Sequence, residues 1–255
     1  MEKQFTYKKI AIVSGKGGIG KTTLAINLGF LFNKEFNLNT VIIDGNLTTP
    51  HLSINLGIYN KHITLNHILK NEVKINDGIY EHPIGLKVIP ASLELRDLEK
   101  IDIFKLPEKL DDLNYNILID SAPGLGKEGI AAISSADEIL FVTQPFTSAV
   151  VDIFRAKKVV EKLDKKILGV VVNARKNQKH ELSDYEIEQF TELPVIESIP
   201  YDIEIEKAQI MKLPLPIHNS KAKANKSFYS LASKLTGIEL EKENFLSKLL
   251  NLFRK

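Results

Sequence analysis

The stretch Ser14–Thr23 reads SGKGGIGKTT and sets the expected fold. It follows a short β-branched run, Lys9–Ser14, and it precedes a helical pattern over Lys21–Phe36. A glycine-rich loop between a strand and a helix fits the pattern G-x-x-x-x-G-K-[ST], in which backbone N–H groups surround a phosphate. The helix N-terminus adds the positive end of its dipole. The stretch therefore predicts a nucleotide-binding loop, with a chance glycine turn as the alternative.

The residue types in this loop predict individual roles. We expect the Lys21 ammonium to reach the β- and γ-phosphates and the Thr22 hydroxyl to coordinate Mg²⁺. Glycines let the backbone approach a phosphate closely, because they carry no Cβ atom. The residues expected to contact ATP or ADP here are Gly15, Lys16, Gly17, Gly18, Ile19, Gly20, Lys21, Thr22 and Thr23.

Outward from the loop, short apolar runs alternate with helical patterns, as in a parallel sheet covered by helices on both faces. The runs are Lys9–Ser14, Thr40–Asp44, Leu86–Pro90, Asn116–Asp120, Glu138–Thr143, Leu168–Asn173 and Val195–Ile199. The helical patterns cover Lys21–Phe36, Glu128–Ser135, Ser148–Leu163, Ser183–Phe190 and Lys221–Leu235, with shorter pieces around Thr64–Lys70 and Phe104–Leu113. We predict a three-layer α/β domain over residues 1–237, with a mostly parallel sheet of about seven or eight strands. Residues 238–255 form an appended segment.

Two apolar runs end in a carboxylate. Asp44 ends the second run, and Asp120 ends the fourth in the Walker B manner, with apolar residues followed by Asp. Carboxylates at the carboxyl end of parallel strands, beside a phosphate loop, are well placed for Mg²⁺ or its waters. We therefore expect Asp120 to hold the metal shell and Asp44 to help order it. An Asx turn is the alternative for Asp44.

The string GKGGIGKTT resembles the deviant Walker A motif of the MinD/ParA family of ATPases. The resemblance spans about residues 8–237 and implies a P-loop NTPase fold with ATP hydrolysis. In that family the early lysine, Lys16 here, crosses a dimer interface to the partner's nucleotide, so the resemblance implies an ATP-dependent homodimer. A cation supplied in trans offsets phosphate charge as an arginine finger does. A solvent-exposed loop lysine is the alternative for Lys16.

The chain departs from the family at Asn46. The family reads D-x-D from the position of Asp44, and its second Asp is linked to hydrolysis. Asn can orient a water molecule but cannot accept its proton. The departure predicts slow hydrolysis with nucleotide binding intact.

The resemblance also implies contacts at the γ-phosphate and the adenine. The segment after Asp120 is similar to the family's switch II, where the N–H of Gly124 would sense the γ-phosphate. Asn173 matches an asparagine that contacts the adenine, and an inserted alanine separates it from Arg175. Pro200 and Asp202 match a segment that closes over the base, with a plain strand-to-helix turn as the alternative.

The composition excludes several classes of protein. The 255 residues include no cysteine, which excludes disulfides, thiolate zinc sites and the iron–sulfur branches of the family. The six histidines show no ligand spacing. The 34 basic and 32 acidic residues nearly cancel, so the chain has no strong net electrostatic field that would attract nucleic acid. Lysine clusters such as Lys157-Lys158 are interpreted as solvated helix faces, although a ParA-like protein would use such clusters to hold DNA.

The C-terminal stretch predicts an amphipathic helix. On a helical projection its apolar residues fall within about 160°, and they are Phe245, Leu246, Leu249, Leu250, Leu252 and Phe253. Lys248, Arg254 and Lys255 lie on the opposite face. A short basic helix with phenylalanines on its apolar side is typical of one that lies in a membrane interface. MinD proteins carry such a helix in this place. Docking on the domain itself or on a partner protein is the alternative.

These features predict a MinD-like ATPase that acts as an ATP-dependent dimerisation and membrane-binding switch and recruits a partner or activator protein. No apolar run reaches the ~18–20 residues of a membrane span, and the N-terminus lacks a signal peptide. We therefore expect a cytoplasmic protein that is peripheral on the inner face of the cell membrane when ATP is bound. The alternatives are a ParA-like DNA-partitioning ATPase and an ATP-binding scaffold that does not hydrolyse ATP.

Overall fold

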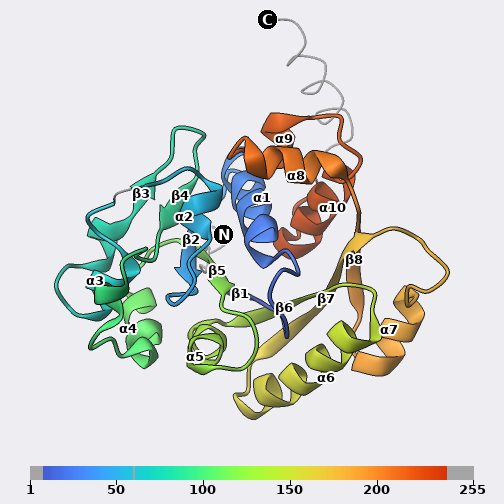
Figure 1. Ribbon diagram of the computed structural model, residues 1–255, viewed down its shortest axis with the longest axis horizontal. Coiled ribbons are helices and arrows are strands. Elements are labelled where there is room, and N and C mark those ends of the chain that lie inside the picture. Colours follow the sequence, from blue (N-terminus) through green and yellow to red (C-terminus); the bar gives the residue numbers. More distant parts are fainter. Residues whose placement is uncertain (1–7, 60, 240–255) are drawn as a thin grey trace, which may run out of the picture.

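A computed structural model describes residues 8–59 and 61–239, which form one α/β domain (Figure 1). The predicted membrane helix and its residues, from Phe245 to Lys255, lie outside the described part of the chain. Eight strands form one sheet in the order β3-β4-β2-β5-β1-β6-β7-β8. The strands are β1 (Lys9–Val13), β2 (Thr40–Gly45), β3 (Tyr80–Glu81), β4 (Lys87–Ile89), β5 (Asn116–Ser121), β6 (Glu138–Thr143), β7 (Lys166–Arg175) and β8 (Val195–Pro200). Only the pairing of β3 with β4 is antiparallel among these strands.

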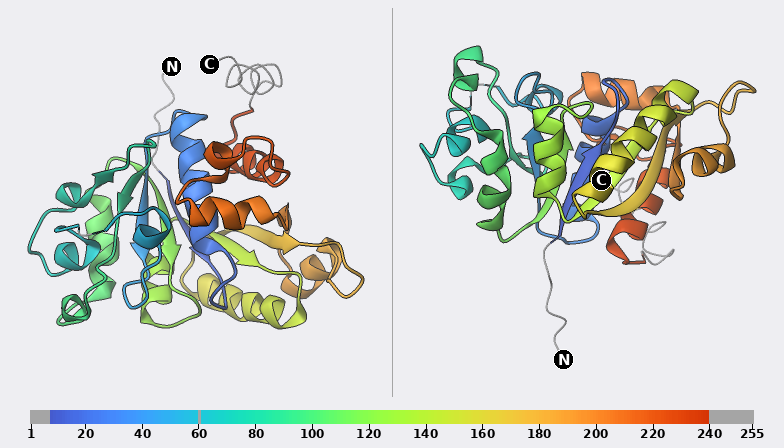
Figure 2. Two further views of the ribbon diagram at one scale, coloured as in Figure 1. Left: turned by 45° about the horizontal axis from the view of Figure 1, so that its top comes forward. Right: turned by 90° about the horizontal axis from the view of Figure 1, so that it is seen from below.

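Helices cover both faces of the sheet, as Figures 1 and 2 show. On one face lie α1 (Lys21–Lys34), α8 (Ile203–Ile210), α9 (Leu215–His218) and α10 (Asn225–Thr236). On the other lie α4 (Leu106–Asp111), α5 (Lys127–Ser135), α6 (Thr147–Lys162) and α7 (Asp184–Thr191). The short helices α2 (Leu52–Asn55) and α3 (Leu65–Leu69) flank the β4 side of the sheet. Single 3₁₀ turns occupy Ile75–Gly78, Leu95–Leu98 and Ile103–Lys105.

The strands are apolar on both faces because each face supplies its own core. Along β1, Ile10 and Ile12 pack into the core beneath α1 and α10. Their neighbours Ala11 and Val13 pack into the core beneath α5 and α6. Successive side chains of a strand point to opposite faces, so two cores require an uninterrupted apolar run. The predicted three-layer α/β fold is confirmed.

The structure extends some predicted elements and adds others. Strand β7 runs to Arg175, with register shifts opposite Gly169 and near Ala174, both of which have positive φ angles. Helix α10 begins at Asn225, and not at the predicted Lys221, because Asn219 holds the preceding turn through hydrogen bonds. The sequence did not predict β3, α2, α8 or α9.

The parallel strands β2, β5 and β1 bring three polar segments to one edge of the sheet. Asp44 of β2 and Asp120 of β5 are paired in register, and the glycine-rich loop follows β1 between β5 and β6. This carboxyl edge is where open α/β sheets hold ligands. No helix in residues 8–59 and 61–239 is both long enough and apolar enough to cross a membrane.

Candidate functional site

The glycine-rich loop connects β1 directly to α1, which begins at Lys21 as predicted. Gly18 and Gly20 have φ angles of 72° and 104°, which side chains rarely allow. Two glycines are also required by close packing. An added Cβ at Gly15 would overlap the side chain of Asp152 on α6, and one at Gly20 would overlap the amide of Asn173 on β7. The surrounding elements therefore fix the loop in place.

Lys21 is buried at the base of this loop. Its side chain is only 7% exposed, and its Nζ donates a hydrogen bond to Ser14 Oγ at 2.9 Å. Burial lowers the pKa of Lys21, although the neighbouring Asp120 carboxylate raises it. Ser14 Oγ in turn donates to the Lys16 carbonyl at 2.7 Å. The ammonium thus lies against the loop that would surround a phosphate.

Thr22 and Asp120 lie together at the start of α1 and the end of β5. Thr22 Oγ1 donates a hydrogen bond to Asp120 Oδ2 at 2.6 Å. The other carboxylate oxygen, Oδ1, is buried and has no hydrogen-bond partner among the described residues. Burial raises the pKa of Asp120 to about 6, against the lowering effects of the Thr22 hydrogen bond and the Lys21 charge.

This pair fits Mg²⁺. A hard cation prefers carboxylate and hydroxyl oxygens, and the unpartnered Oδ1 supplies a free acceptor beside a second oxygen ligand. A bound cation would also offset the cost of burying the Asp120 charge. Thr22 and Asp120 are therefore the residues that would hold Mg²⁺, and their metal roles stay a prediction.

Asp44 is fully buried next to Asp120 and holds the loop that follows β2. Its Oδ1 accepts from the Asn46 N–H and its Oδ2 from the Leu52 N–H, both at 3.2 Å. The first of these is the Asx turn that we considered as the alternative for Asp44. Burial and the Asp120 charge raise the pKa of Asp44 well above its usual range. A role for Asp44 in the metal shell stays a prediction.

Asn46 is buried in the same loop, where its side chain contacts Thr49. Nδ2 donates to the Thr49 carbonyl at 2.6 Å, and Oδ1 accepts from the Thr49 hydroxyl at 3.1 Å and the Thr49 N–H at 3.3 Å. The preceding Thr48 donates to Glu128 Oε1 on α5 from both its N–H and its hydroxyl. In this arrangement the Asn46 amide stabilises the loop.

Lys16 lies at the surface of the loop. Its side chain is 44% exposed, and its Nζ is 3.8 Å from Asp152 Oδ2 on α6. Arg155 Nη1 lies 4.0 Å from the other oxygen of the same carboxylate. A partly exposed ion pair of this length contributes little free energy, so Lys16 can leave it at low cost.

Gly124 contacts the glycine-rich loop from the end of β5. Its N–H donates to the Ser14 carbonyl at 2.9 Å, and its φ angle of 73° favours glycine. The segment that resembles switch II therefore touches the loop, as its predicted role requires. Sensing of a γ-phosphate by Gly124 stays a prediction.

A cavity of about 420 Å³ lies beside the loop and would take the base and sugar of a nucleotide. Asn173, Pro200 and Asp202, the three residues predicted to lie at the adenine, all line this cavity, and their contact with a base stays a prediction. Asn173 Nδ2 donates to the Ile19 carbonyl at 2.7 Å, which joins β7 to the loop. The Asp202 carboxylate caps α8 and accepts from the Ala224 N–H, so its oxygens have partners within the fold.

Several residues that line this cavity were not predicted from the sequence. They include Gln144, Phe146, Lys176, Tyr201 and Gln209. Tyr201 lies between Pro200 and Asp202 in the sequence. It could have been predicted to line the cavity, because aromatic rings commonly line small-molecule sites. The others come from elements that are distant in the sequence.

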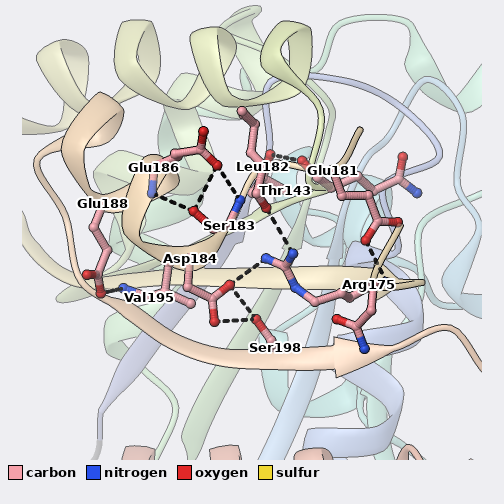
Figure 3. Close-up of polar contacts among 12 residues, drawn as sticks. Thr143, Arg175, Glu181, Leu182, Ser183, Asp184, Glu186, Glu188, Val195 and Ser198 are labelled. Carbon is pink, nitrogen blue, oxygen red and sulfur yellow. Dashed lines mark hydrogen bonds and ion pairs between the residues drawn. The ribbon is translucent and has the colours of Figure 1, made fainter. Parts of the chain in front are cut away.

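Arg175 does not contact this cavity through its guanidinium. Figure 3 shows the group between α7 and β8, where Nη1 donates to the Leu182 carbonyl at 2.9 Å and Nη2 pairs with Asp184. Asp184 also accepts from the hydroxyl of Ser198. The alanine before Arg175 lies in a bulge with positive φ. Arg175 therefore fixes the loop before α7, and a nucleotide contact is not supported.

The histidines and the lysine clusters were both predicted to lie at the surface. No group of three or more His, Asp or Glu side chains in the described residues is arranged to hold a metal ion, and none of the six histidines is buried.

Lys157 was wrongly interpreted as part of a solvated face. It is 8% exposed because it packs beneath α7, where its Nζ is 2.6 Å from Glu192 Oε2.

Comparisons with known proteins place this geometry in context. The family model for the CobQ/CobB/MinD/ParA nucleotide binding domain matches residues 10–215. An ATP-binding protein of Methanocaldococcus jannaschii is 36% identical over 250 residues, which cover 94% of this chain and 94% of that protein. The septum site-determining protein MinD of Pyrococcus horikoshii, solved with Mg-ADP, superposes with a TM-score of 0.86 at 29% identity, covering 90% of this chain and 96% of that chain. The cell division ATPase MinD of Pyrococcus furiosus gives a TM-score of 0.86 at 31% identity, covering 92% and 100%.

Proposed function

Since the chain belongs to the CobQ/CobB/MinD/ParA family of nucleotide-binding domains, we propose that it is a MinD-like ATPase whose ATP-bound form is a homodimer on a membrane surface. The family membership confirms the resemblance found in the glycine-rich loop. The observation that carries the ATPase proposal is the hydrogen bond from Thr22 to the buried Asp120 carboxylate, at 2.6 Å, beside the buried Lys21 ammonium.

The proposed reaction is transfer of the γ-phosphoryl group of ATP to water. Lys21 holds the β- and γ-phosphates and offsets their charge, while the loop N–H groups orient them. Thr22 and Asp120 would hold Mg²⁺, which supplies charge compensation when bound. The base would lie in the cavity that Asn173 and Tyr201 line. The residues thus bind and orient ATP at the carboxyl edge of the sheet.

The dimer proposal rests on Lys16. Within residues 8–59 and 61–239 its exposed side chain forms an ion pair only with Asp152, at a distance of 3.8 Å that implies a weak pair. A second copy with ATP would present phosphate oxygens, which would be better partners for the Lys16 ammonium than the Asp152 carboxylate 3.8 Å away. ATP would therefore stabilise the dimer through a contact that ADP lacks.

The membrane proposal rests on the amphipathic pattern from Phe245 to Lys255. One short helix binds a bilayer weakly, and two helices on one dimer bind much more tightly through avidity. Anionic lipid would add roughly 1 kcal/mol for each basic residue near the surface. The ATP-bound dimer would then lie on the inner face of the cell membrane and recruit a partner or activator protein.

Hydrolysis is expected to be slow because Asn46 replaces a carboxylate and its amide is already bound to Thr49. The same observation favours one other candidate, a scaffold that binds ATP and does not turn it over. A DNA-partitioning role is less favoured, since Lys157 is buried in an ion pair and is not presented to a ligand.

The test is release of inorganic phosphate from Mg-ATP by the full chain. We expect measurable turnover that falls by at least about 100-fold in Lys21→Ala, with no change in Lys34→Ala at the exposed end of the same helix. Turnover that survives in Lys21→Ala would contradict the assigned site. Tight ATP binding without phosphate release, with or without lipid, would instead support the scaffold.

A further inference from the structure

A second cavity, of about 400 Å³, lies at the carboxyl end of β4. It is bounded by the segment from Pro90 to Asp97, by α2 and by the start of α3. The Leu65 N–H donates to the Pro90 carbonyl, and the Ser92 N–H donates to Asn66 Oδ1, so α3 is held firmly against this segment. The cavity shares no lining residue with the nucleotide cavity. Its volume is that of a small-molecule site, at an edge of the sheet where such sites occur.

The acidic side chains of this cavity already have partners. Asp97 Oδ2 accepts from Ser92 Oγ at 2.6 Å, and its oxygens lie 3.9 Å from Lys70 Nζ and 4.0 Å from His67 Nε2. Glu94 pairs with Arg96 at 2.5 Å. These carboxylates are therefore neutralised within the wall and leave little negative charge for a cationic ligand.

A basic side chain of the wall is left without an acidic partner. Lys61 makes no ion pair with any carboxylate in residues 8–59 and 61–239, and its Nζ lies 3.5 Å from the centre of the Tyr80 ring. His62 lies beside it on the cavity wall. Lysine over an aromatic ring keeps most of its capacity to bind an anion, because the ring takes none of its three donors in a strong hydrogen bond.

The wall also holds a buried hydroxyl without a partner. Ser53 of α2 is 3% exposed, and its Oγ makes no hydrogen bond to any described residue. An unsatisfied buried hydroxyl is unfavourable for the folded protein, and a ligand that completes its hydrogen bonding would account for it. This observation is independent of the charges on Lys61 and His62.

We propose that this cavity binds a small metabolite through an anionic group, a phosphate or a carboxylate. Lys61 supplies the charge for that group, and the Ser53 hydroxyl supplies a hydrogen bond at the α2 wall. The proposal does not depend on ATP hydrolysis or on membrane binding. It concerns a site that is separate from the phosphate loop.

The experiment is a titration of the ¹⁵N-labelled full chain, saturated with Mg-ADP, with inorganic phosphate and with glycerol as an uncharged control. We expect saturable shifts of the Ala91, Ser92 and Glu94 amides with phosphate and none with glycerol. Lys61→Ala is expected to weaken this binding by about tenfold or more. The matched control, Lys74→Ala at an exposed position outside the cavity, should leave it unchanged. Shifts confined to amides of the glycine-rich loop, or equal affinity in Lys61→Ala, would overturn the proposal.

Ser53→Ala provides a second readout that separates a binding role from a structural one. Because the hydroxyl lacks a partner, its removal is expected to leave the ligand-free protein as stable as before or more stable, while phosphate binding weakens. The control is Ser135→Ala, whose equally buried hydroxyl donates to the Ala131 carbonyl at 2.7 Å. A loss of stability in Ser53→Ala as large as that in Ser135→Ala would contradict a binding role for this hydroxyl.

Discussion

The Thr22 hydroxyl donates a hydrogen bond to Asp120 Oδ2 at 2.6 Å and so joins the first turn of α1 to the end of β5. The two residues are far apart in the sequence, and each was predicted to bind Mg²⁺ from a different motif. Their contact leaves Asp120 Oδ1 buried without a partner in the described part of the chain. This arrangement places a free carboxylate oxygen beside the Thr22 hydroxyl, where the proposed Mg²⁺ would bind.

The buried charge of Asp120 predicts that the nucleotide-free protein becomes less stable as pH rises from about 4 to about 6. The folded pKa is about 6 and the ordinary value is 3.8, so in this interval the folded state holds a proton that the unfolded state has lost. Its stabilising contribution is complete below pH 4 and is lost as pH passes 6. Asp120→Asn removes the contribution of Asp120, while the buried Asp44 carboxyl, whose pKa is also raised, still titrates. The substitution should raise the free energy of unfolding at pH 7 by about 1–3 kcal/mol. Urea denaturation of both proteins across this range measures the difference, and equal slopes with pH would contradict the prediction.

The same pKa predicts how Mg²⁺ affinity depends on pH. A metal ion and a proton compete for Asp120, so the affinity for Mg²⁺ in the presence of ADP should fall as pH drops below about 6 and should be level above it. The loss should approach tenfold for each pH unit well below the pKa. Calorimetric titration at several pH values provides the measurement. An affinity that is independent of pH between 5 and 7 would show that Asp120 does not bind the metal.

Asn46→Asp is expected to raise the rate of ATP turnover by about tenfold or more, because it restores a group that can accept a proton from water. It also replaces the donor that holds the Thr49 carbonyl at 2.6 Å, so stability should fall by about 1 kcal/mol. Asn46→Ala is the control, since it loses the same contact without gaining a base. Fast turnover in the wild type with no gain in Asn46→Asp would contradict the slow-hydrolysis proposal.

The C-terminal segment is expected to carry the membrane affinity. A chain that ends after Glu243 should fail to float with anionic vesicles in the presence of ATP, whereas the full chain should float. Leu250→Glu, on the apolar side, should reduce flotation far more than Asn251→Glu, which places the same charge on the polar side. Equal flotation of the truncated and full chains would refute membrane binding through this segment.

The layers of the fold were predictable because they depend on local patterns. Continuous apolar runs such as Thr40–Asp44 require burial on both faces of a sheet. The glycine-rich loop before Lys21 predicted that the first strand is followed directly by a helix. The missed elements α8 and α9 are short, and they form through contacts with α1 that the local sequence does not reveal. One of these is the hydrogen bond from the Leu215 N–H to Asn27 Oδ1.

The residues of the candidate site were predictable where a sequence motif specifies their position. They were less predictable where a side chain also makes contacts within the fold. Lys21, Thr22 and Asp120 lie together as their motifs indicate. Asn173 lines the expected cavity, yet its amide also holds the Ile19 carbonyl, which no spacing could reveal. Arg175 follows Asn173 closely in sequence but is directed to Asp184 by the bulge between them.

We propose that ATP, and not ADP, joins two copies of this chain through Lys16. Light scattering coupled to gel filtration tests it directly, with the full chain in saturating Mg-ADP or in Mg-ATP. We predict the monomer mass in ADP and twice that mass in ATP. Lys16→Ala should remain a monomer in both, and Lys34→Ala should behave as the wild type. One mass in both nucleotides, or an ATP-bound dimer that persists in Lys16→Ala, would contradict the account.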